Sequence, residues 1–83
     1  MDKNRIFRFS LDIKELLKKQ DTSEATKRIE QAHLTHEEFD FFEKCLRSDG
    51  YDAATDRFKH NFSDNSEFLR LVSLVTASVK VKK

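Results

Sequence analysis

The sequence predicts a mainly α-helical protein, a compact bundle of four to five short helices, and three observations lead to that fold class. A side chain able to cap a helix stands three positions before a glutamate at Asp12, Asp21 and Thr35, and each such pair is a helix-start signal. Apolar residues then recur with the helical period of about 3.6 residues. The 83 residues include no proline and one glycine, so few positions force the chain to break. A chain of this length is one domain.

The N-terminal residues 5–13, RIFRFSLDI, follow a different pattern. Apolar side chains at Phe7, Phe9 and Leu11 alternate with polar ones, and a period of two predicts a short, half-buried strand. Ile6 interrupts the alternation. From the Asp12 start signal we expect a short helix ending near Gln20, with Ile13, Leu16 and Leu17 on one face.

The next predicted helix covers about residues 22–33. Its apolar stripe consists of Ala25, Ile29 and Ala32. Because alanine buries little area, we expect this helix to be peripheral or closely docked against a neighbour.

The strongest helix signal covers residues 35–46, THEEFDFFEKCL. Thr35 and Glu38 can form a capping box, and Leu34 can pack on Phe39 as a hydrophobic staple. Phe39, Phe42 and Leu46 share one face with Cys45 at its edge, which predicts a buried aromatic stripe. Gly50 follows where a left-handed residue would end the helix. Phe41 lies on the flank, and two interpretations stay open: it packs on a neighbouring helix, or it is an exposed anchor for a partner.

The C-terminal third predicts two further helices. Asp52 can cap the first, at roughly 52–62, whose apolar residues are Tyr51, Ala54, Phe58 and Phe62. Ser63 or Asn65 can cap the second, whose stripe is Phe68, Leu71, Val72, Val75 and Val79. Residues 75–82 also alternate between apolar and polar. We favour a helix to about residue 77 with an extended tail; the alternative is an α+β fold in which N- and C-terminal strands pair. Residues 1–4 and 80–83 are expected to fray.

Composition limits the compartment and the class of protein. A single cysteine excludes an internal disulfide framework and fits a reducing compartment. The sequence contains no run of about 18 apolar residues, so it predicts no membrane span. The first residues lack the apolar segment of a signal peptide. We therefore expect a cytoplasmic protein without membrane contact.

The residues that could carry chemistry are few. His33, His36 and Cys45 could suggest a metal, but structural zinc takes four converging ligands, and Cys45 fits better as a small core residue. There is no glycine-rich loop, nucleophile elbow or HExxH run. The sequence predicts a non-enzymatic protein without a cofactor or metal.

Charge is unevenly distributed, although the formal net charge is +1. Residues 1–19 carry six basic and three acidic residues, a net +3; residues 20–67 carry six and twelve, a net −6; residues 68–83 carry four basic residues and no acidic one. An acidic helical middle favours a small regulatory or inhibitory module that binds a partner protein with a basic surface. The candidate binding residues are Glu37, Asp40, Phe41, Glu43, Asp52 and Asp56. A homodimer is the other assembly that the small apolar content favours.

The alternative function is a small nucleic-acid-associated transcriptional regulator that uses the basic ends of the chain. Its candidate phosphate-binding residues are Arg5, Arg8, Lys14 and Lys18. An N-terminal strand carrying Arg5 and Arg8, followed by helices, resembles the ribbon-helix-helix repressors, whose paired strands enter the major groove. The resemblance covers at most the first 33 residues, the first helix is short for that fold, and its turn glycine is absent. The LTHEEFDFF run at 34–42 resembles a helix start in a family of small helical nucleoid-associated modulators. Neither resemblance assigns the chain to a family.

Overall fold

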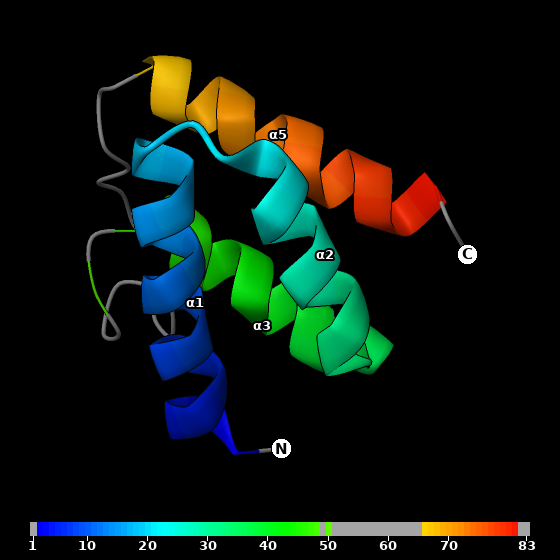
Figure 1. Cartoon of the computed structure of the whole chain (residues 1–83). Coiled ribbons are helices and arrows are strands. Elements are labelled where there is room, and N and C mark those ends of the chain that lie inside the picture. Colours follow the sequence, from blue (N-terminus) through cyan, green and yellow to red (C-terminus); the bar gives the residue numbers. More distant parts are fainter. Residues whose placement is uncertain (1, 49, 51–65, 82–83) are drawn as a thin grey trace.

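Four helices form the described part of the molecule: α1 (Lys3–Lys18), α2 (Thr22–Ala32), α3 (His36–Arg47) and α5 (Ser66–Val81). The computed structural model describes residues 2–48, 50 and 66–81. α1 packs mainly on α3, and α2 packs mainly on α5, which also contacts α1 and α3. In Figure 1, α5 lies across one end of the bundle that the other three helices form. The mainly helical fold class is confirmed, and the described residues contain no β-strand.

The predicted N-terminal strand is wrong, because residues 5–11 belong to α1. This helix starts at an Asp2 cap, whose side chain accepts a hydrogen bond from the Arg5 amide at 3.2 Å, and not at Asp12. Its buried side chains follow the helical period: Ile6, Ser10, Ile13 and Leu17. Ser10 can lie in the core because its Oγ donates to the Phe7 carbonyl at 2.6 Å. Burial thus follows Ile6, the residue that broke the alternation, while Leu11 is 44% exposed.

α2 begins as predicted, with Asp21 accepting a hydrogen bond from the Glu24 amide at 3.2 Å. Ala25 and Ile29 are buried, whereas Ala32 is exposed where the helix ends. His33 ends α2 in the left-handed region, at φ 51° and ψ 51°. This narrow apolar stripe is sufficient to hold α2 on the bundle because α2 packs closely on α5.

α3 confirms the capping box and the buried stripe. Thr35 Oγ1 accepts from the Glu38 amide at 3.1 Å, and the Thr35 amide donates to the Glu38 carboxylate at 3.0 Å. The buried residues are Phe39, Phe41, Phe42, Cys45 and Leu46. The expected left-handed glycine cap is wrong: α3 ends at Arg47, and its cap is Ser48 in an extended conformation, two residues before Gly50.

α5 runs to Val81, beyond the end near residue 77 that the sequence predicted, so the C-terminal strand and its pairing with an N-terminal strand are also wrong. The helix accepts Thr76 in its buried face because the threonine Oγ1 donates to the Val72 carbonyl at 2.9 Å. The predicted stripe is confirmed: Leu71, Val72 and Val75 are buried, and Phe68 and Val79 pack against the core.

The core draws side chains from all four described helices, and its largest fully buried side chain is Phe42. The Phe42 ring stacks on Phe9 of α1, with centroids 5.2 Å apart, and meets Phe39 at 5.9 Å. The helix predicted at 52–62, with its caps and apolar residues, lies outside the described residues. None of the described helices has the length and apolar character needed to cross a membrane.

Candidate functional site

The outer face of α3 carries the acidic residues of the predicted binding surface that the structure describes. Glu37 and Asp40 are exposed, on the side of the helix opposite its buried stripe. Glu43 is partly exposed at the edge of this face, and Asp52 and Asp56 lie outside the described residues. We call Glu37, Asp40 and Glu43 the α3 acidic face.

Basic partners from the same helix accompany two of these acids. His36 Nε2 lies 3.6 Å from an Asp40 carboxylate oxygen, one helical turn away. Arg47 Nε lies 3.5 Å from a Glu43 carboxylate oxygen. Both contacts are single-turn pairs near the surface, which hold side chains weakly and can exchange for a partner's cation. Arg47 therefore offsets the charge of Glu43, and Glu37 and Asp40 are the most accessible carboxylates of the α3 acidic face.

Phe41 is not an exposed anchor. Its side chain is only 7% exposed and belongs to the core cluster. The ammonium of Lys3, in the first turn of α1, lies 5.7 Å from the centroid of the Phe41 ring, a cation–π contact. The start of α1 thus lies beside Phe41. Of the two interpretations of Phe41, packing on a neighbouring helix is therefore the correct one.

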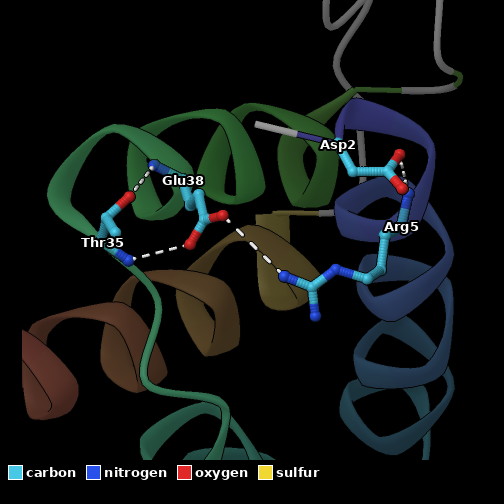
Figure 2. A network of polar contacts seen from close by, with 4 residues as sticks. All are labelled: Asp2, Arg5, Thr35 and Glu38. Atoms are coloured by element: carbon cyan, nitrogen blue, oxygen red, sulfur yellow. Dashed lines mark hydrogen bonds and ion pairs between the residues drawn. The ribbon is translucent and has the colours of Figure 1, made fainter.

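A polar network joins the start of α1 to the start of α3. Figure 2 shows Glu38 between Thr35 and Arg5: one carboxylate oxygen accepts from the Thr35 amide, and the other lies 3.8 Å from Arg5 Nη2. Asp2 caps the same turn of α1 that carries Arg5. The Glu38 side chain is 17% exposed, against 67% for Arg5. Glu38 therefore stabilises the start of α3 through the capping box, and its contact with Arg5 lies where the starts of α1 and α3 meet.

The four basic residues of the nucleic-acid alternative lie on α1 and not on a strand, so the groove-entering ribbon of the ribbon-helix-helix fold is absent from the described residues. Arg8 and Lys18 are exposed. Arg5 contacts Glu38, and Lys14 Nζ donates to the Ser48 carbonyl at 2.9 Å. Two of the four cations therefore contribute to the α1–α3 contact.

Cys45 is a core residue, as predicted. Its side chain is fully buried between α1 and α3, and burial raises the pKa of the thiol from 9.0 to about 11, against smaller opposing effects of Lys14 and of a hydrogen bond with Ser10. At neutral pH the thiol stays protonated, whereas nucleophilic attack and metal binding use the thiolate. His33 and His36 are exposed, and the residues that the structure describes include no group of three His, Cys, Asp or Glu arranged to hold a metal.

An open groove of about 430 Å³ lies between α2 and α5, a feature that the sequence analysis missed. α2 contributes Ser23, Thr26, Lys27 and Glu30 to its walls, and α5 contributes Leu74 and Ser78. Leu74 is 50% exposed. The sequence signal was available: Leu74 lies outside the apolar stripe of residues 68–79, and an apolar side chain outside the buried stripe indicates an open surface.

Comparison of the chain with protein-family models, curated proteins and solved structures finds no match.

Proposed function

We propose that this protein is a non-enzymatic regulatory or inhibitory module that binds a basic surface of a partner protein through the α3 acidic face. The observation that carries the proposal is the exposure of Glu37 and Asp40 on a helix whose opposite side is buried. Their carboxylates point to solvent from a fixed backbone, which suits recognition by lysine and arginine side chains.

The rigidity of α3 supports this function. The helix has a complete capping box, and five of its twelve residues are buried. Binding to a preformed surface loses less conformational freedom than binding that must first order a loop. The net −6 of residues 20–67 would also attract a basic partner over a distance and speed encounter.

The test is charge reversal of the two exposed acids, measured by capture of partners from a native lysate of the source cells. We expect Glu37→Lys combined with Asp40→Lys to lose a protein that the wild type retains, and the retained complex to dissociate as salt is raised. The matched control is Asp12→Lys combined with Glu15→Lys, which makes the same charge change at the same spacing on the exposed side of α1. If both double variants capture the same proteins as the wild type, the α3 acidic face is not the binding surface.

The alternative, nucleic-acid binding through α1, is favoured by one observation: this helix carries five basic and two acidic residues. Of the four candidates, Arg5, Arg8 and Lys18 are exposed, and Arg5 already contacts Glu38. Phosphate contacts predict a gel shift that weakens steeply with salt and that Arg8→Glu combined with Lys18→Glu abolishes. Absence of any retardation at low salt and micromolar protein would end this alternative.

A further inference from the structure

The groove between α2 and α5 combines an exposed apolar side chain with charges of opposite sign. Leu74 is one of two large apolar residues that are exposed in the described part of the chain; the other is Leu11 of α1. Leu74 lines the groove, together with Lys27 and Glu30 of α2. Ser23, Thr26 and Ser78 are the small side chains of its walls. Because these side chains are short, the backbone of another helix can approach the groove walls closely.

The charge pattern of the groove is complementary to itself. Lys27 is exposed and Glu30 is partly buried, with one carboxylate oxygen covered; the two lie three residues apart on α2, so they are neighbours on one helix face. When two copies of such a helix lie antiparallel about a two-fold axis, the lysine of each meets the glutamate of the other. This reciprocity is what a two-fold symmetric interface requires.

We propose that a second copy of this chain occupies the groove, with α2 of each copy seated between α2 and α5 of the other. Lys27 then pairs with Glu30 of the second copy, twice, and Leu74 covers the small side chains Ser23 and Thr26 of the second copy's α2. This interface lies on the α2–α5 side of the molecule and uses none of the residues of the α3 acidic face. The dimer proposal is therefore tested independently of the proposed function. Because few apolar side chains are covered, the dimer is weak and depends on concentration.

Sedimentation of the full chain over a range of concentrations tests the proposal. The wild type is expected to show a reversible monomer–dimer equilibrium, and Leu74→Lys to remain monomeric. The matched control is Leu11→Lys, which places the same charge at the other exposed leucine and leaves the equilibrium unchanged. Circular dichroism checks that each variant is folded.

A charge swap identifies the geometry. Lys27→Glu alone brings carboxylates together at both symmetric contacts, and we expect the dimer dissociation constant to rise about tenfold or more. Adding Glu30→Lys in the same chain restores the opposite charges and should bring the constant back to near the wild-type value. A wild type that stays monomeric at every concentration overturns the proposal, and so does a dimer that Leu74→Lys leaves intact or that the charge swap does not restore.

Discussion

Gln20 lies in the left-handed region of backbone space, at φ 62°, in the turn that joins α1 to α2. The Asp21 amide donates to the Leu16 carbonyl, and the Gln20 amide donates to the Leu17 carbonyl, both at 2.9 Å. This pair of bonds is a Schellman motif, whose left-handed position favours glycine. We expect Gln20→Gly to stabilise the protein by about 0.5–1 kcal/mol, since a side chain costs roughly 1–2 kcal/mol in this conformation and glycine loses more entropy on folding.

Urea unfolding followed by circular dichroism measures the effect of Gln20→Gly. The control is Lys19→Gly, one residue earlier at an ordinary φ of −86°, which should destabilise. The Gln20 side-chain amide donates a hydrogen bond to the Glu67 carboxylate at 3.5 Å, in an exposed position. Destabilisation by Gln20→Gly would mean that this contact outweighs the backbone strain.

At the scale of a single residue, the titration of Cys45 also predicts how the stability of the protein depends on pH. Its pKa is raised by burial to about 11 in the folded protein, against 9.0 in an exposed chain. The folded state therefore holds the thiol proton more tightly. The stability that the raised thiol pKa contributes is complete below pH 9 and is lost as pH rises through 11. Between these two pH values the free energy of unfolding falls by about 1.4 kcal/mol per pH unit.

The measurement is urea unfolding of the wild type and of Cys45→Ala at pH 7.5 and at pH 10.5. Lysines and the tyrosine titrate in both proteins, so their contributions cancel in the difference. We expect the wild type to lose more stability than Cys45→Ala between the two pH values. Equal losses would show that the thiol titrates at the same pH in the folded and unfolded chains.

At the scale of the helix, the Thr35 cap is the clearest contribution to stability. The hydroxyl accepts from the Glu38 amide, which otherwise has no partner within the helix. We expect Thr35→Ala to cost about 1 kcal/mol of unfolding free energy, and Thr35→Ser to recover most of that loss by keeping the oxygen. The comparison with Arg5→Ala separates the cap from the ion pair: at 3.8 Å with Arg5 largely exposed, that pair is worth little. Thermal or urea unfolding of the three variants checks the order.

The helices also show how far local patterns predict structure. The cap signals at Asp21 and Thr35 locate the starts of α2 and α3, because capping involves residues only three positions apart. The strand prediction for residues 5–13 was wrong because an alternating pattern of polar and apolar residues fits both a strand and a helix whose surface carries both kinds of side chain. The choice between them depends on what covers each face, and the Phe9 ring stacks on Phe42, more than thirty positions later.

For the molecule as a whole, Phe42 is the side chain on which the packing of α1 against α3 depends. It is fully buried and contacts aromatic rings from both helices. Replacing such a phenylalanine with alanine costs about 3–5 kcal/mol, a large share of the stability of a small domain. We expect Phe42→Ala to be largely unfolded and Phe42→Leu to remain folded with reduced stability, as measured by urea unfolding. Leu11→Ala, at an exposed position, serves as the control; a Phe42→Ala protein as stable as this control would contradict the packing.

The sequence by itself determined the helical class, two helix starts and the buried stripes of α3 and α5, because caps and helical periodicity depend on residues within a few turns of one another. Only the tertiary structure decided that residues 5–11 are helical, that Phe41 is buried beside Lys3, that Arg5 and Lys14 contact α3, and that a groove opens between α2 and α5. These outcomes depend on which surfaces meet in space, and the α1–α3 contact joins residues more than thirty positions apart.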